Sequence, residues 1–388
     1  MSNPTEPLPS LDELLDDTAF HRRHLGPDEA GVTQMLEVVG SPNLDDLIDA
    51  IIPESIRDRT PLDLAGPMGE EEALSRLRGF ADRNTVVTSL IGTGWYDTHM
   101  PAVIARNVFE NPAWYTAYTP YQPEISQGRL EVLLGFQTMI SDLTGMDLAN
   151  ASLLDEATAG AEAMTLLKRA HRGDRNTFLV DSDCHPQVID VIRTRARPLG
   201  IEIQTADPWT AQLDGDHDVF GSLIAFPGSG GNLRPLDRVV DHLRGAGVGV
   251  AVTADLLALC LVTPPGEFGV DVVVGSAQRF GVPMGFGGPH AGFMAVSEQH
   301  KRMLPGRLVG TSVDSHGKTA HRLALQTREQ HIRRERATSN ICTAQVLLAV
   351  ISALYAAYHG PAGLRRIAQR TNRLASMLAT GQIGRAHV

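Results

Sequence analysis

Cysteine and lysine are both scarce in this chain of 388 residues, which contains three of each. The cysteines, Cys184, Cys260 and Cys342, form no CxxC pair. This sparse, odd set argues against a disulfide framework and indicates a reducing compartment. Basic residues are also in the minority, because 34 Lys and Arg stand against 45 Asp and Glu, for a net charge of -11. Such acidity argues against nucleic acid or an anionic membrane surface as the main partner.

The chain also lacks a recognisable targeting segment and a long uninterrupted hydrophobic run. Its first residues are acidic around Asp12 and Asp16, without the basic and apolar pattern of a signal peptide or the Arg-rich pattern of a transit peptide. The longest apolar stretch, residues 341–358, is interrupted by polar residues such as Thr343 and Gln345. We therefore expect a buried or interface helix there, no membrane span, and a cytoplasmic protein.

Hydrophobic residues make up 43% of the sequence, enough for a sizeable core, and their spacing divides the chain into three regions. Residues 1–85 are expected to form a helical N-terminal extension, because apolar residues recur there at helical spacing. Residues 86–330 are expected to form a large α/β domain. Residues 331–388 are expected to form a truncated C-terminal helical segment.

The end of the chain has an unusual sequence. Residues 383–388 read IGRAHV, which is what one reading frame of a common sequencing-adapter oligonucleotide encodes. We expect these residues to be an artefact and the natural chain to continue past about residue 380. A genuine polar tail is the alternative interpretation.

The middle region alternates apolar strands with amphipathic helices. Strands are expected at 177–181, 201–205, 220–226, 248–253, 270–275 and 291–296, and helices at 129–143, 159–171, 186–197 and 236–245. Continuous apolar strands separated by helices predict a mostly parallel sheet that is covered by helices on both faces.

Two of these strands lead into a segment with the layout of a pyridoxal phosphate (PLP) site. One strand ends at Asp255, and the next continues into a glycine-rich turn, residues 278–288, QRFGVPMGFGG. A PLP enzyme needs a lysine just past that second strand, because only an amine can hold the cofactor as a Schiff base. Gln278 and Arg279 stand there instead, and none of the three lysines of the chain follows such a strand.

Three residues could belong to a degenerate cofactor pocket. Thr158 lies where a helix begins, so backbone N–H groups there could bind phosphate; an ordinary helix cap by Asp155 or Thr158 is the alternative. Asp255 could pair with a pyridine nitrogen or cap the following segment. His185 could stack on a planar cofactor or make a local hydrogen bond. The nearby Asp, Cys and His residues are too close in sequence to surround a metal, and we expect no metal site.

Several long segments together resemble one family. They are residues 20–27 (FHRRHLGP), 92–101 (GTGWYDTHMP), 124–131 (EISQGRLE), 151–156 (ASLLDE), 275–283 (GSAQRFGVP), 287–290 (GGPH), 325–334 (LQTREQHIRR) and 337–345 (ATSNICTAQ). They look like the N-terminal half of the glycine cleavage system P-protein, the PLP-dependent, decarboxylating glycine dehydrogenase. The resemblance implies a fold-type-I PLP-transferase fold that is duplicated, with two related halves packed as a pseudo-dimer.

The same resemblance explains the missing lysine. It implies that the C-terminal half carries the Schiff-base lysine and holds PLP covalently, while Gln278 takes the matching position here. The implied reaction decarboxylates glycine and passes the aminomethyl group to the lipoyl group of the H-protein. The implied partners are therefore the C-terminal half, either fused or as a separate subunit, the H-protein, and glycine as substrate.

In such enzymes the active site lies between two units, so this chain would line the site of its neighbour. Residues 86–124 are rich in aromatic residues and in loop-forming glycine and proline, and the candidates are Tyr96, His99, Tyr118 and Tyr121 of this segment, for which simple packing is the alternative. A competing interpretation is a non-catalytic scaffolding or docking subunit for a lipoyl-bearing partner. An independent aminotransferase or decarboxylase is disfavoured, because the chain offers no candidate amine.

Overall fold

The structure is a computed structural model that describes residues 8–14, 19–116, 120–213, 215, 217–285, 287–328, 330–337, 341 and 345–383. The chain forms two compact units, Met1–Ser89 and Leu90–Val388.

The first unit consists of short helices. They are α1 Leu11–Leu14, α2 Ala19–His24, α3 Glu29–Val39, α4 Leu44–Ile51, η1 Glu54–Ile56 and α5 Glu70–Ala81. Helix α3 begins at Asp28, whose carboxylate accepts a hydrogen bond from the Gly31 N–H at 2.9 Å, and it ends at Gly40 in the left-handed conformation (φ 75°). Among the side chains described in this unit, none is buried, so the helices enclose no core of their own.

The second unit is built on a seven-stranded sheet with the strand order β1-β7-β6-β5-β4-β2-β3. The strands are β1 Leu148–Ala149, β2 Thr177–Asp181, β3 Glu202–Ala206, β4 Val219–Phe226, β5 Gly249–Ala254, β6 Val272–Ser276 and β7 Gly292–Val296. The five neighbouring strands β3, β2, β4, β5 and β6 run parallel to one another. Strand β7 is antiparallel to both of its neighbours, β6 and β1. The predicted mostly parallel sheet is therefore confirmed.

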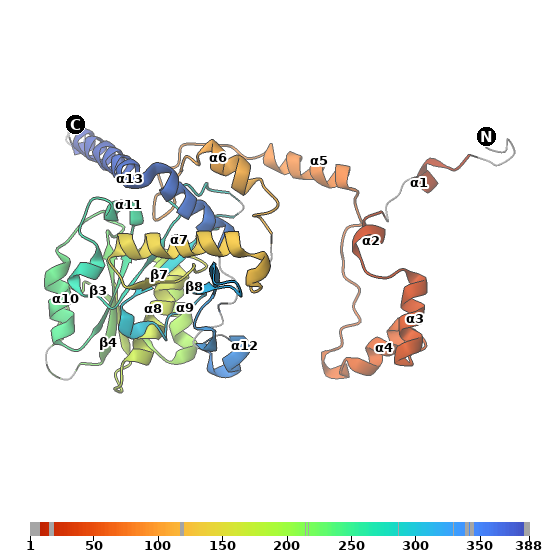
Figure 1. Cartoon of the computed structure of the whole chain (residues 1–388), viewed down its shortest axis with the longest axis horizontal. Helices are drawn as coiled ribbons and strands as arrows, with labels where there is room; N and C mark the ends of the chain where they lie inside the picture. Colours follow the sequence, from red (N-terminus) through yellow and green to blue (C-terminus); the bar gives the residue numbers. More distant parts are fainter. Residues whose placement is uncertain are drawn as a thin grey trace. The chain divides into compact units, whose positions relative to one another are not determined.

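Helices pack on both faces of this sheet, as predicted (Figure 1). One core cluster combines side chains of α7 Gln127–Thr144, α10 Leu236–Gly245 and α13 Val346–Ile383; the other combines those of α8 Glu156–Ala170 and α9 Pro186–Ala196. Successive residues of β5 point to opposite faces, so Val250 and Val252 join the first cluster and Ala251 joins the second.

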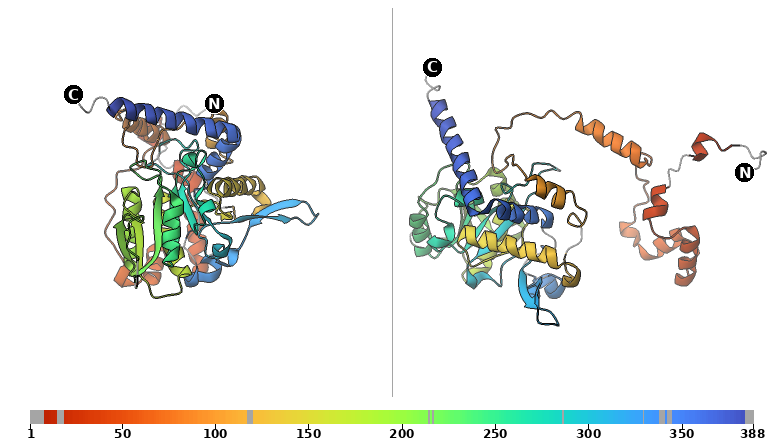
Figure 2. Two further views of the ribbon diagram at one scale, coloured as in Figure 1. Left: turned by 90° about the vertical axis from the view of Figure 1, so that its left-hand side faces the viewer. Right: turned by 45° about the horizontal axis from the view of Figure 1, so that its top comes forward.

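Short elements connect these layers. They are α6 Ala102–Ile104, η2 Ala105–Phe109, η3 Pro123–Ile125, η4 Arg197–Leu199, α11 Leu256–Leu259, η5 Pro265–Phe268, η6 Glu298–His300, η7 Gln326–Arg328, α12 Gln330–Arg333 and η8 Arg334–Arg336. An antiparallel hairpin, β8 Val309–Val313 and β9 Thr319–Leu323, forms a second sheet that projects from the unit (Figure 2). This hairpin was not predicted from the sequence.

Helix α13 contains most of the long apolar stretch. Among the described residues, it is the one helix whose length and composition would allow it to cross a membrane. Its first turns are a core element, however, because Val350 and Ile351 are fully buried in the cluster beside α7. The helix bends at Gly360, which has non-helical angles and precedes Pro361. The predicted buried helix is thus present in the part of the stretch that the structure describes.

Candidate functional site

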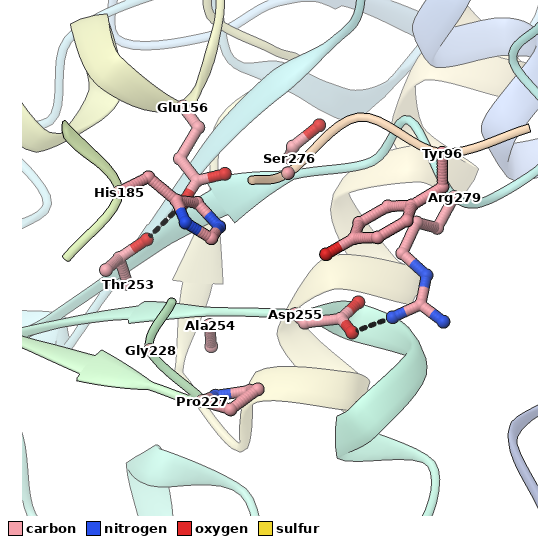
Figure 3. Close-up of a pocket in the computed structure, with 11 residues that line it drawn as sticks. Tyr96, Glu156, His185, Pro227, Gly228, Thr253, Ala254, Asp255, Ser276 and Arg279 are labelled. Carbon is pink, nitrogen blue, oxygen red and sulfur yellow. Dashed lines mark hydrogen bonds and ion pairs between the residues drawn. The ribbon is translucent and has the colours of Figure 1, made fainter. Parts of the chain in front are cut away.

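A cavity of about 60 Å³ lies where four parallel strands end (Figure 3). Ligands of open α/β sheets bind at this edge, because the loops that follow the strands converge there. The lining residues are Gly94, Tyr96, Glu156, His185, Pro227, Gly228, Thr253, Ala254, Asp255, Ser276 and Arg279. They form the last residues of β5 and β6, follow β2, β4, β5 or β6, open α8, or belong to the aromatic loop 92–101.

Glu156 is a half-buried residue that contributes a carboxyl group to this cavity. It is the first residue of α8, and its Oε1 accepts a hydrogen bond from the Thr253 hydroxyl at 2.7 Å. Burial raises the pKa of Glu156 to about 7; the bond from Thr253 opposes this shift, and the Asp255 and Asp155 carboxylates add to it. At neutral pH this side chain is therefore divided between its neutral and charged forms. Glu156 was not among the site residues predicted from the sequence.

Asp255 is already paired within the chain. Its Oδ2 forms an ion pair with the Arg279 guanidinium, and its Oδ1 accepts the Leu257 N–H at 3.0 Å, which caps α11. The guanidinium also lies over the Tyr96 ring, 4.9 Å from the ring centroid (Figure 3). Arg279 of this chain thus occupies the side of Asp255 that was expected to pair with a pyridine nitrogen.

His185 has a local hydrogen bond. Its Nδ1 lies 2.9 Å from the Ser229 hydroxyl, and its ring packs so closely on Gly94 that an added Cβ there would lie 3.2 Å from the imidazole. Burial lowers the pKa of His185, although the Asp183 and Asp255 carboxylates act in the opposite direction. The ring is therefore mainly uncharged at neutral pH.

Gln278, at the position of the expected lysine, does not line the cavity. Its side chain is only 1% exposed, and its amide bonds three backbone groups. Nε2 donates to the Tyr96 carbonyl at 2.7 Å and to the Val282 carbonyl at 2.8 Å, while Oε1 accepts the Tyr96 N–H at 3.3 Å.

The remaining predicted residues lie outside the cavity lining. The Thr158 N–H donates to the Asp155 carboxylate at 2.7 Å, so this end of α8 is capped by its own chain. His99 is exposed. The Tyr121 hydroxyl accepts a hydrogen bond from Arg307, and Tyr118 lies outside the described residues. The structure therefore brings Tyr96, His185 and Asp255 together in the cavity lining, whereas Thr158, His99 and Tyr121 are not part of it.

The cavity does not fit the PLP that the resemblance implies. Its volume of about 60 Å³ accommodates a few water molecules, whereas pockets for drug-sized ligands span about 300–1,000 Å³. The expected phosphate donor, the Thr158 N–H, is taken by Asp155, and the nearby carboxyl groups of Glu156 and Asp255 disfavour an anion. Gln278 has no amine and is not among the residues that line the cavity.

The strand order, the helical layers and the strand-end cavity define a fold-type-I PLP-transferase fold. The sphingosine-1-phosphate lyase of Burkholderia pseudomallei shares it with a TM-score of 0.53 at 14% identity, covering 83% of this chain and 74% of that one. A crystal structure of glycine decarboxylase (P-protein) of the glycine cleavage system, in inhibitor-bound form, matches with a TM-score of 0.79 at 38% identity, covering 92% of this chain and 82% of that one.

The sequence places the chain within this class. The family described as glycine cleavage system P-protein matches residues 22–386, and the chain belongs to that family. Glycine dehydrogenase (decarboxylating) of Stenotrophomonas maltophilia strain K279a is 57% identical over 371 residues, which cover 96% of this chain and 38% of that protein. The enzyme of Rhodopseudomonas palustris is 60% identical over 362 residues, covering 93% of this chain and 36% of that protein. The chain thus spans little more than a third of these relatives.

Proposed function

We propose that this chain is the N-terminal half, or a separate subunit, of a decarboxylating glycine dehydrogenase, and that it is inactive without the lysine-bearing half. Gln278 carries this proposal: the residue at the matching position is a buried amide held by three hydrogen bonds, beside a cavity too small for the cofactor. The partial coverage of the curated relatives, 36–38% of their length, supports the same conclusion.

In this proposal the C-terminal half holds PLP covalently and decarboxylates glycine, and the aminomethyl group passes to the lipoyl H-protein in the cytoplasm. This chain contributes the wall of its neighbour's site. The candidates are exposed in the structure, with His99 on the surface and Tyr96 and Tyr121 39% and 41% exposed. Tyr118 is proposed with them on sequence alone.

The family contains chains of two sizes, which supports either a fused or a separate partner. The curated relatives are covered over little more than a third of their length, whereas the P-protein chain of the crystal structure is covered over 82% of its length. Chains close in length to this one therefore occur beside much longer ones.

Mixing two purified polypeptides tests the proposal. In the presence of oxidised lipoyl H-protein as acceptor of the aminomethyl group, we expect no release of CO2 from carboxyl-labelled glycine by this chain with PLP, and release once a lysine-bearing C-terminal half is added. The control omits this chain and keeps the partner. Release by this chain alone would refute the proposal, and binding of a lipoyl protein without any restored release would favour the scaffolding role.

A further inference from the structure

The aromatic loop 92–101 is held to the α/β unit by one buried amide. The Gln278 side chain bonds both the N–H and the carbonyl of Tyr96, at 3.3 and 2.7 Å, in the way that a neighbouring strand would pair with that residue. A third bond, to the Val282 carbonyl at 2.8 Å, fixes the amide to its own turn. Because the side chain is 1% exposed, water does not replace these bonds without local opening.

Neighbouring side chains hold the same loop at other points. The Arg279 guanidinium covers the Tyr96 ring, and Gln187 Nε2 donates to the Thr93 carbonyl at 2.6 Å. The Trp95 ring meets His290 edge to face, with 4.4 Å between ring centroids. The loop is thus fixed on its inner side, while Asp97 and His99 are exposed on its outer side.

The chemistry of the amide explains why it suits this position. Lysine donates hydrogen bonds but accepts none, so an amine here would leave the Tyr96 N–H without a partner. An ionised carboxylate would accept that N–H but could not donate to the carbonyls of Tyr96 and Val282. Of these three groups, only the amide satisfies all three backbone groups that Gln278 contacts.

We infer that Gln278 is a positioning residue, which holds loop 92–101 in the shape in which it meets the lysine-bearing half. The inference rests on the proposed function for the identity of the partner, whereas the clamp on Tyr96 stands on the geometry of this chain alone. Gln278, which stands at the position expected for the Schiff-base lysine, thus holds a loop at the edge of the neighbour's site.

Among the residues that the structure describes, Gln137 and Gln127 form clamps of the same kind, and Gln137 provides a matched control. Gln137, 5% exposed, accepts the Val309 N–H at 2.8 Å and donates to the Val309 carbonyl at 3.1 Å. Gln127 pairs in the same way with His321, at 2.8 and 2.9 Å. Both hold the β8–β9 hairpin, and neither bonds the aromatic loop.

Amide hydrogen exchange tests the clamp on the chain by itself. Gln278→Met keeps the side-chain volume but removes all three bonds, and we expect exchange in residues 92–101 to accelerate about tenfold or more. Gln137→Met is the control, in which the hairpin should loosen while the loop exchanges as in the wild type. If Gln278→Met does not fold, Gln278→Asn, whose side chain keeps the amide but is too short to bond Tyr96, should still accelerate exchange in residues 92–101. Unchanged loop exchange in the variants that fold would overturn the clamp.

Activity with the lysine-bearing half tests the positioning role. For Gln278→Met we expect kcat for glycine decarboxylation to fall about 10- to 100-fold, more than KM rises, since displaced groups lose interactions made mainly in the transition state. PLP content and association of the halves should match the wild type, and Gln137→Met should retain near wild-type kcat. A loosened loop with undiminished kcat would refute the inference. An inactive wild-type pair would instead refute the proposed function, while hydrogen exchange would still decide the clamp.

Discussion

At the scale of single residues, Glu156 makes the stability of the chain depend on pH. Its pKa is raised on folding from 4.5 to about 7, so the folded protein binds this proton more tightly than the unfolded chain does. The protonated Glu156 side chain therefore stabilises the folded protein relative to the ionised one. This contribution is fully present below about pH 4.5 and is lost as the pH rises through 7. Glu156→Gln removes the titration and can keep the hydrogen bond from Thr253. We expect the variant to be more stable than the wild type at pH 8 by up to about 3 kcal/mol.

Urea unfolding at pH 5 and pH 8, followed by tryptophan fluorescence, measures this difference. The advantage of the variant should be large at pH 8 and small at pH 5. Glu131→Gln, at an exposed position on α7, is the control and should change stability little at either pH. An equal advantage at both pH values would show that Glu156 is not the titrating group.

Gln278 shows why restoring one lysine does not restore a coenzyme site. In Gln278→Lys a charged amine would be buried where Gln278 is 1% exposed, leaving the Tyr96 N–H unpaired, and Arg279 would still occupy the side of Asp255. We expect a loss of about 3 kcal/mol or more in stability. We also expect no PLP adduct at residue 278 after borohydride reduction and peptide mapping. The wild type, digested in parallel, controls for surface lysines, and a stoichiometric adduct at 278 would contradict this reading of the cavity.

At the scale of elements, the turn after β6 fits tightly against α13. Gly281 has a left-handed backbone (φ 80°), and an added Cβ would clash with the Tyr355 ring. We expect Gly281→Ala to cost about 2–4 kcal/mol of stability in thermal or urea unfolding, from backbone strain plus overpacking. Gly285→Ala in the same turn meets nothing within 4 Å and has no positive φ, so it should cost little. Adding Tyr355→Leu to Gly281→Ala should relieve part of the loss, and equal costs at the two glycines would rule out this explanation.

Element types followed from the sequence where hydrophobic periodicity was strong. The strand at 177–181 and the helix at 236–245 have the predicted bounds, because continuous burial and a clear amphipathic face leave little ambiguity. The β8–β9 hairpin was missed because its strands are only partly buried and carry small or polar residues. The antiparallel direction of β7, which pairs with both β6 and β1, depends on the complete sheet, and no local pattern predicts it.

From the sequence, only those site residues that follow a predicted strand could be identified. Asp255 and His185 were identified because each follows a strand, and both do line the cavity. Glu156 and Thr253 were missed because their contact joins the start of α8 to the end of β5, 97 residues away along the chain. The bonds of Gln278 to Tyr96 span 182 residues and likewise depend on the complete fold.

At the scale of the whole molecule, the two units differ in what stabilises them. The buried hydrophobic residues of the described chain run from Ile104 to Ala368 and thus lie entirely within the second unit. The longest helix of the first unit, α5, has 12 residues, and isolated helices of this length are marginal in water.

We therefore expect a fragment of residues 1–89 to melt gradually, without a cooperative transition, when followed by circular dichroism. A fragment of residues 90–383 should unfold cooperatively, within about 1 kcal/mol of the full chain, because it retains both core clusters. The full chain is the reference, and its cooperative transition should match that of the longer fragment. A sigmoidal transition in residues 1–89 would mean that their exposed leucine, isoleucine and valine side chains pack together. A large loss of stability in residues 90–383 would mean that the first unit supports the sheet, and either result would contradict the separation of stability between the two units.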